Sequence, residues 1–303
     1  MDIFFQQLIN GLTLGSIYAL IALGYTMVYG IIQLINFAHG EIFTAGGYIG
    51  VIVLSFLQAR GVLENHPALG LTLAFLLAMI YCAFLAVALE NMAYRPLRNA
   101  SRLALLLSAL GMSIFFSNGM MLMQGVYDKA YPLFFTSGGF ELAGVYVTRM
   151  QVFIVIGSFV LMVALNLFVR KTRLGKAMRS TAQDRVMSSI LGINANKTIV
   201  TTFIIGAVLA AAAGVMVGLY YGSVRFDMGF VPGIKAFAAA VLGGIGNLTG
   251  AMIGGMIIGM VEIFAAGYLA SEYKDVFAFV ILILVLYFRP TGIMGEQVDD
   301  TRV

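Results

Sequence analysis

Charge is the scarcest property of this 303-residue chain. Asp, Glu, Lys and Arg make up 11% of it, against about 25% in soluble domains. Hydrophobic residues reach 61%, and such a chain does not cover a water-facing surface. Tryptophan is absent, so tyrosine and phenylalanine are the candidate aromatics for a membrane interface. The sequence therefore predicts an integral membrane protein.

The chain also lacks the residues that enzymes and metal centres use. Its one cysteine, Cys82, lies in an apolar run and leaves no internal disulfide, and its only histidines are His39 and His66. No HExxH, GxSxG or GxxxxGK[ST] motif is present. These absences disfavour a metal site, an intramembrane hydrolase and ATP binding by this chain. We expect no catalytic residue, no metal and no cofactor in it.

Apolar runs of about 20 residues, the length that crosses a bilayer as a helix, recur along the sequence. A shorter run at 233–246 predicts a half-helix or re-entrant segment that lines a cavity. Residues 126–149 are more polar and predict an extramembrane loop with short irregular structure. The predicted fold is an all-α polytopic membrane helix bundle in a single domain, 1–303. We expect about eight spans: 8–32, 41–59, 68–90, 103–125, 150–169, 198–221, 248–270 and 276–288.

The basic residues predict the orientation, because cytoplasmic loops are enriched in Lys and Arg. Alternating crossings place the segments 91–102, 170–197 and 289–303 on one side of the membrane. This side collects 12 basic residues, and the opposite side collects 5. We therefore expect the segment 170–197 in the cytoplasm, and the N-terminus and the loop 126–149 outside.

The segment 170–197 is the longest basic interruption of the apolar runs. Ser180 followed by Gln183 predicts a capped helix from 180 to 191, and Gly192 is a natural stop. Ala182, Val186 and Ile190 place an apolar stripe along that helix. An apolar face outside the bilayer predicts a docking surface for another protein. An alternative, that the segment only anchors the membrane boundary, fits its first residues: Arg170, Lys171 and Arg173.

Few ionisable residues lie within the apolar runs, where their cost makes a function the default expectation. Glu262 is either a cavity-facing residue or a packing partner for a neighbouring helix, with equal support for both. Glu41 and Glu90 are expected near the cytoplasmic boundary, Glu90 as a partner for Arg95 or Arg98. Lys235 lies at the mouth of the short segment. This scarcity disfavours an ion-coupled carrier and suits a passage for a partly apolar solute.

The motif NFAHGE, at 36–41, is a polar break between two apolar runs. It predicts either a cavity-lining or gating turn, or a plain break whose Asn36 and His39 satisfy the freed backbone groups; we favour the second. The candidate pathway or gate residues are Asn36, His39, Glu41 and Glu262.

Four motif blocks in order carry a family resemblance. They are GLTLGSIYALIALGYTMVYGIIQLINFAHGE (11–41), AYRPLR (93–98), RLGKAMRSTAQDRVMSSILGIN (173–194) and KAFAAAVLGGIGNLTGAMIGG (235–255). With the ending RPTGIMG (289–295), the chain resembles the permease subunit of bacterial branched-chain amino acid ABC transporters, of the Liv-type H kind. The resemblance implies a multi-pass protein of the bacterial inner membrane that imports leucine, isoleucine and valine.

The resemblance also implies partners: a second homologous permease subunit, two ATP-binding subunits and a periplasmic substrate-binding protein. ATP is then bound by the partner subunits. The family's ATPase-coupling loop matches the segment 173–194, which gives coupling roles to Arg179, Asp184, Val186, Ile190 and Gly192. A permease of the same family for another small solute (urea or a short amide) and a stand-alone secondary carrier or channel are the alternatives.

Overall fold

The structure is a bundle of long apolar helices. The computed structural model describes residues 2–98, 100–132, 138–142, 144–269 and 271–295. Within these residues, seven helices are long and apolar enough to cross a membrane. The all-α polytopic bundle predicted from the sequence is therefore confirmed. The seven helices are α1 (Asp2–Ile32), α2 (His39–Ala59), α4 (Pro67–Leu89), α5 (Arg102–Gln124), α6 (Arg149–Lys171), α9 (Ala195–Tyr221) and α11 (Leu248–Tyr268).

Two predicted apolar segments form shorter helices, α10 (Phe230–Gly243) and α12 (Lys274–Phe288). At 1.5 Å per residue they are about 21 and 22 Å long, less than the roughly 30 Å of hydrocarbon in a bilayer. The short helix α10 is the half-helix expected over 233–246. The expected eighth span over 276–288 is α12, which is shorter than a full crossing. Short turns complete the helical elements: α3 (Val62–Asn65), the π-helical η1 (Glu90–Tyr94) and the 3-10 helix η2 (Ser271–Tyr273).

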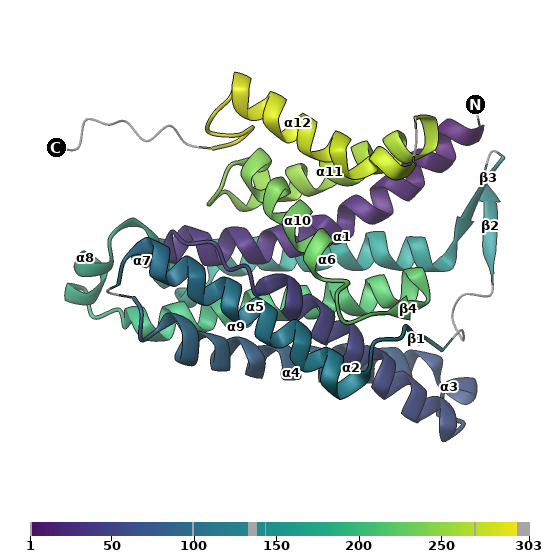
Figure 1. Ribbon diagram of the computed structural model, residues 1–303, viewed down its shortest axis with the longest axis horizontal. Helices are drawn as coiled ribbons and strands as arrows, with labels where there is room; N and C mark the ends of the chain where they lie inside the picture. The colour runs from purple at the N-terminus through teal and green to yellow at the C-terminus, as the bar shows by residue number, and fades with distance from the viewer. Residues whose placement is uncertain (1, 99, 133–137, 143, 270, 296–303) are drawn as a thin grey trace.

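The long helices lie roughly along the long axis of the molecule (Figure 1). Two small helices, α7 (Arg173–Gln183) and α8 (Arg185–Ile190), lie at one end, and the N-terminus lies at the other (Figure 1). The chain therefore presents the basic segment 170–197 and the N-terminus at opposite ends of the bundle, as the charge pattern predicts.

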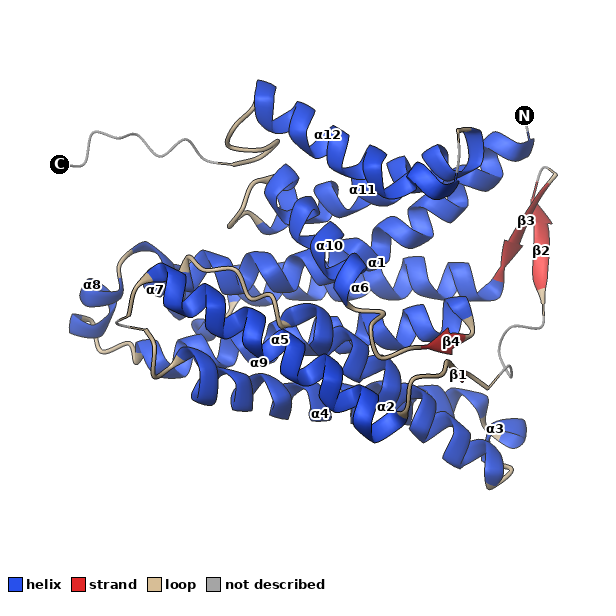
Figure 2. Ribbon diagram, in the orientation of Figure 1, coloured by secondary structure: helices blue, strands red, loops and turns tan. Residues whose placement is uncertain are grey.

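Two small antiparallel sheets lie at the end that carries the N-terminus (Figure 2). Strand β1 (Lys129–Ala130) pairs with β4 (Ser223–Val224), and β2 (Gly139–Leu142) pairs with β3 (Val145–Thr148). The buried Tyr131 then joins this layer to the bundle, because its hydroxyl donates to the Gly47 carbonyl at 2.5 Å. The loop predicted as irregular thus contains short strands, with residues 133–137 and 143 outside the described part.

Helices α1 and α9 form the centre of the bundle, and glycines allow their close packing. A Cβ atom at Gly259 of α11 would lie 2.3 Å from the Cα atom of Gly15 on α1. A Cβ atom at Gly214 of α9 would lie 2.1 Å from the carbonyl oxygen of Phe43 on α2. Such close approach is how membrane helices associate without a hydrophobic driving force.

The predicted single helix over 180–191 is wrong, because the segment folds as two helices that meet at Asp184. The Asp184 carboxylate accepts from the backbone N–H groups of Val186 and Met187 at 2.8 and 3.0 Å, which caps α8. An N-cap that satisfies two free donors favours a new helix start at this residue. Ser180, the predicted cap, lies inside α7, and its hydroxyl lies 2.9 Å from that of Ser188.

Each helix of this pair has a defined start and end. Thr172 caps α7 by accepting from the Gly175 N–H at 3.0 Å. Gly192 has a φ of 81°, a left-handed conformation that glycine adopts without strain, and it follows the last residues of α8. The prediction of Gly192 as the stop is therefore confirmed.

Helix α2 starts inside the bundle rather than at the end of α1. Its first residue, His39, packs against Gly24 of α1, whose Cβ position would lie 2.2 Å from His39 Nε2. Gly24 lies eight residues before the end of α1, which is about 12 Å along the helix axis. The next residue, Gly40, packs against Gly229 immediately before α10. Two helix N-termini, of α2 and α10, therefore meet in the interior.

Candidate functional site

The polar residues of NFAHGE are buried in the structure. The Asn36 side chain accepts a hydrogen bond from the hydroxyl of Tyr94 at 3.0 Å, and its Nδ2 has no partner within the described residues. The freed N–H of His39 bonds the backbone carbonyl of Asn36 at 3.0 Å. Asn36 therefore connects the break to η1 through its side chain, while its backbone carbonyl accepts from the freed N–H of His39.

His39 lies between α1 and α9. Its ring packs edge-on against Tyr25, with 4.8 Å between ring centroids. Its Nε2 atom faces the α1 backbone near Ile21 and Gly24 without a hydrogen bond of acceptable geometry. The His39 side chain is 1% exposed and closely packed between α1 and α9, and its role as a pathway or gate residue stays a prediction.

Glu41 is buried in the first turn of α2. The hydroxyl of Ser113, on α5, donates to Oε1 of Glu41 at 3.2 Å. The other carboxylate oxygen, Oε2, has no hydrogen-bond partner within the described residues. Glu41 lines a cavity of about 20 Å³ between α2, α5 and α10.

Glu262 is a packing partner and is not cavity-facing. Its Oε2 atom lies 2.7 Å from the Nζ atom of Lys235 on α10, and it accepts from the hydroxyl of Tyr18 on α1 at 2.8 Å. The Nζ atom of Lys235 also lies 2.5 Å from a carboxylate oxygen of Asp275 on α12. Lys274 approaches Glu262 at 3.9 Å. This ion network joins four helices: Lys235 and Glu262 are buried in it, whereas Asp275 and Lys274 on α12 are 42 and 45% exposed.

A second buried pair lies at the end of α4. Arg98 forms an ion pair with Glu90, whose side chain is fully buried, and it also hydrogen-bonds the side-chain oxygen of Asn196 at the start of α9. The expectation that Glu90 pairs with Arg95 or Arg98 is met by Arg98. The pair connects the segment 91–102 to the base of α9.

Hydrogen bonds attach the pair of small helices α7 and α8 to the spanning helices. Arg179 donates to the backbone carbonyls of Val169 and Arg170 at the end of α6. Arg185 donates to the carbonyl of Ile31 at the end of α1 at 2.7 Å, and burial together with the nearby Arg98 lowers its pKa. These hydrogen bonds link α7 and α8 to the ends of α6 and α1.

The apolar side chains of α8 are exposed in this chain. Val186, Met187, Ile190 and Leu191 are 54 to 73% exposed, although each is a large hydrophobic residue. Of the predicted stripe, Ala182 on α7 is partly buried. We call the four exposed residues the α8 apolar tip. Large apolar side chains gathered outside the lipid-crossing helices indicate an interaction surface.

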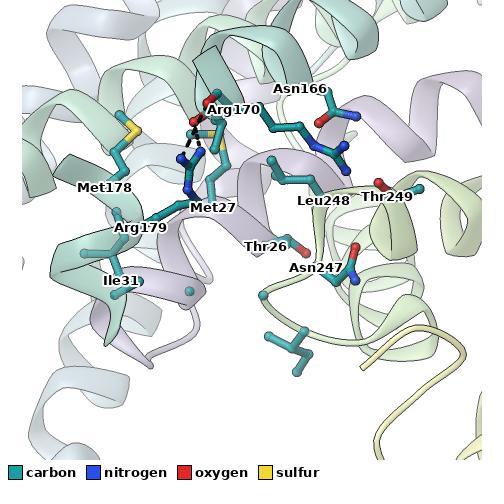
Figure 3. Close-up of a pocket in the computed structure, with 15 residues that line it drawn as sticks. Thr26, Met27, Ile31, Asn166, Arg170, Met178, Arg179, Asn247, Leu248 and Thr249 are labelled. Atoms are coloured by element: carbon teal, nitrogen blue, oxygen red, sulfur yellow. Dashed lines mark hydrogen bonds between the residues drawn. The ribbon is translucent and has the colours of Figure 1, made fainter. Parts of the chain in front are cut away.

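A cavity of about 540 Å³ lies beside α7 (Figure 3). The ends of α1 and α6 and the turn before α11 form the rest of its wall. In Figure 3 the Arg179 guanidinium points at the α6 carbonyls, and the Arg170 guanidinium points toward Asn166. Asn247 and Thr249 line the opposite side of the cavity. They follow Gly246, which adopts a φ of 94° in the turn before α11. The cavity lies between α7 and that turn.

The structure thus places the predicted residues in three separate places. Asn36, His39 and Glu41 lie together at the start of α2, whereas Glu262 belongs to the separate ion network. The segment that holds α7 and α8, at one end of the bundle, carries the five residues predicted for coupling: Arg179, Asp184, Val186, Ile190 and Gly192. No group of three His, Cys, Asp or Glu side chains suited to a metal occurs among the described residues.

Sequence reasoning missed three interior partners, Tyr18, Lys235 and Ser113. Lys235 and Glu262 were each noted alone, and the rule that intramembrane charges pair with one another would have joined them. For Tyr18 and Ser113 the sequence carries no such signal, because a hydroxyl in an apolar run commonly bonds its own helix.

Comparison with known proteins gives a consistent result. Residues 7–286 match the family model described as branched-chain amino acid transport system / permease component. The chain is 50% identical over 297 residues to the high-affinity branched-chain amino acid transport system permease protein BraD of Pseudomonas aeruginosa, covering 97% of this chain and 96% of that protein. It is 48% identical to the corresponding permease protein LivH of Escherichia coli K12, with the same coverage. It is also 29% identical to a probable branched-chain amino acid transport permease protein LivH of Methanocaldococcus jannaschii, over 92% of this chain and 89% of that protein.

Proposed function

Because the chain belongs to the family of permease components of branched-chain amino acid transport systems, we propose that it is the membrane-spanning subunit of an ATP-driven importer for leucine, isoleucine and valine. The observation that carries this proposal is the 50% identity to BraD over nearly the full length of both chains. The seven long apolar helices supply the membrane crossings that such a subunit needs.

In this proposal the chain works within a larger assembly. A second homologous permease completes the pathway, two ATP-binding subunits lie on the cytoplasmic side, and a periplasmic binding protein delivers the amino acid. ATP is bound and hydrolysed by the partner subunits, since this chain carries no GxxxxGK[ST] motif. The chain lies in the bacterial inner membrane with its basic segments in the cytoplasm.

The α8 apolar tip is the proposed contact with an ATP-binding subunit. It is exposed, apolar and held to α1 and α6 by Arg185 and Arg179. Closure of the ATP-binding subunits then moves the tip as a rigid body, and the attached helices follow. Asp184 and Gly192 set the start and end of α8 and so fix the direction in which its apolar residues point.

Reconstitution into proteoliposomes tests the proposal. The chain with its partner permease, both ATP-binding subunits and the binding protein is expected to take up leucine only when ATP is supplied to the cytoplasmic side. The chain alone, under a proton or sodium gradient, is expected to take up none. Uptake by the chain alone would favour a secondary carrier or channel. ATP-dependent uptake of urea or a short amide in place of leucine would favour a permease for another solute.

A further inference from the structure

Three glutamates are buried in the bundle, and they differ in how their charge is compensated. Glu90 is paired with Arg98, and Glu262 with Lys235. Glu41 is 3% exposed and has no ion-pair partner among the described residues. A buried carboxylate without a cation is costly, and evolution retains such groups chiefly where they act on a solute or ion.

Two helix starts meet beside Glu41. Helix α2 begins at His39 and α10 at Phe230. Gly40 and Gly229 let the two helix starts approach closely, since a Cβ atom at Gly40 would lie 2.5 Å from the Gly229 carbonyl oxygen. The partial positive charge of a helix N-terminus favours a negative group nearby, and Glu41 lies in the first turn of α2.

A small cavity lies where these elements meet. Its volume is about 20 Å³, and Tyr25, Glu41, Ser113, Gly229 and Gly233 contribute to its wall. This is room for about one water molecule, and therefore also for one ammonium group. The unpartnered Oε2 atom of Glu41 is the strongest free acceptor at this cavity, and Ser113 supplies a hydroxyl from α5.

The cavity is close to the outer face of the chain. Phe230, which also lines it, is 58% exposed, and α5 beside it has a largely exposed surface. The Phe230 side of the cavity therefore lies toward the exposed surface of the chain.

We propose that Glu41 and Ser113 form a contact site for the α-ammonium group of an amino acid as it crosses the membrane. This inference rests on the proposed function. The Glu41 carboxylate and the Ser113 hydroxyl accept from the ammonium N–H donors. The carboxylate and the apolar side chain of the amino acid stay outside the cavity, which has room for the ammonium group alone.

The physical consequence is a lower barrier for a charged group in a dry region. An ammonium group loses its water on entering an apolar passage, and one charge-assisted hydrogen bond restores part of that solvation. Removing the negative charge of Glu41 while keeping its shape is therefore expected to slow translocation about ten-fold, which corresponds to one such hydrogen bond.

The test uses the complete reconstituted importer with loaded binding protein, and measures leucine uptake and ATP hydrolysis in the same vesicles. For Glu41→Gln we expect uptake per ATP to fall about ten-fold, while ATP hydrolysis stimulated by the binding protein stays within two-fold of wild type. Glu41→Asp keeps the charge and is expected to recover part of the uptake. Ser113→Ala is expected to lose a few-fold. The matched control, Glu64→Gln, changes an exposed glutamate and is expected to behave as wild type.

Two results overturn the inference while leaving the proposed function intact. One is normal uptake per ATP in Glu41→Gln. The other is a parallel loss of uptake, ATP hydrolysis and thermal stability in both Glu41→Gln and Glu41→Asp, which indicates a purely structural carboxyl group. A wild-type importer that shows no ATP-dependent leucine uptake overturns the proposed function and the inference with it.

Discussion

Replacing Lys235 with methionine removes the cation nearest to Glu262 while filling most of the same volume. Lys235 is 2% exposed and Glu262 is 3% exposed, so neither charge is solvated by bulk water. In the Lys235→Met variant, Glu262 keeps its hydrogen bond from Tyr18 and the distant Lys274 at 3.9 Å. Its charge is otherwise uncompensated, and the first turns of α10 lose their attachment to α11 and α12.

The size of the effect follows from the geometry. Breaking a buried ion pair by removing one partner costs about 3–5 kcal/mol. The remaining hydrogen bond and the half-exposed Lys274 place Lys235→Met near the lower end, at about 3 kcal/mol. At roughly 2–4 °C per kcal/mol for a large domain, the thermal midpoint is expected to fall by on the order of 6–12 °C. The double variant Lys235→Met/Glu262→Leu removes both charges and is expected to recover to within about 1 kcal/mol of wild type.

Thermal and denaturant unfolding in detergent, followed by circular dichroism, measures both variants. Lys274→Met is the control, because Lys274 is half-exposed and lies at the limit of ion-pair distance, and we expect a change below about 1 kcal/mol. The reasoning is refuted if Lys235→Met unfolds within about 1 kcal/mol of wild type. It is also refuted if the double variant is no more stable than the single one.

Two further predictions concern packing and coupling. Gly214→Val places atoms against the carbonyl of Phe43 and is expected to destabilise the protein by at least about 1–3 kcal/mol. The control is Gly111→Val, at a glycine with open space around its Cβ position, which is expected to change stability by less than about 0.5 kcal/mol. Equal losses in the two variants would contradict the packing argument. Asp184→Ala removes the α8 cap, worth about 1 kcal/mol, and is expected to leave membrane insertion intact while lowering uptake per ATP. Gly192→Val forces a β-branched residue to a φ of 81° and is also expected to lower uptake per ATP without preventing membrane insertion. Normal uptake per ATP in both variants would show that the geometry of α8 is irrelevant to coupling.

The course of the chain through the membrane was accessible from the sequence because the bilayer imposes a length on each apolar run. The half-helix over 233–246 was predicted for the same reason, since 14 residues do not cross. The stop at Gly192 followed from the backbone freedom of glycine. These features depend on local composition, which a single sequence contains.

Contacts between distant helices were not accessible in this way. Tyr18 and Glu262 are 244 residues apart, and their hydrogen bond depends on how α1 packs against α11. The burial of Glu41 between α2, α5 and α10 was not accessible either, because the sequence gives the end of an apolar run but not the helices that pack around the next one. Asp184 was overlooked as a cap because Ser180 with Gln183 has the same local signature, and only the fold decides between two possible starts.

The central claim is that α8 is where this chain meets its ATP-binding partner, and site-directed cross-linking tests it most directly. The one native cysteine, Cys82, is buried, so Ile190→Cys adds a single exposed thiol that a maleimide photo-cross-linker labels. In the assembled importer, Ile190→Cys is expected to give a covalent adduct with the ATP-binding subunit, whereas Tyr127→Cys, exposed in the loop expected on the opposite side of the membrane, is expected to give none with that subunit. Failure of Ile190→Cys to form this adduct in a complex that still transports leucine would contradict the account.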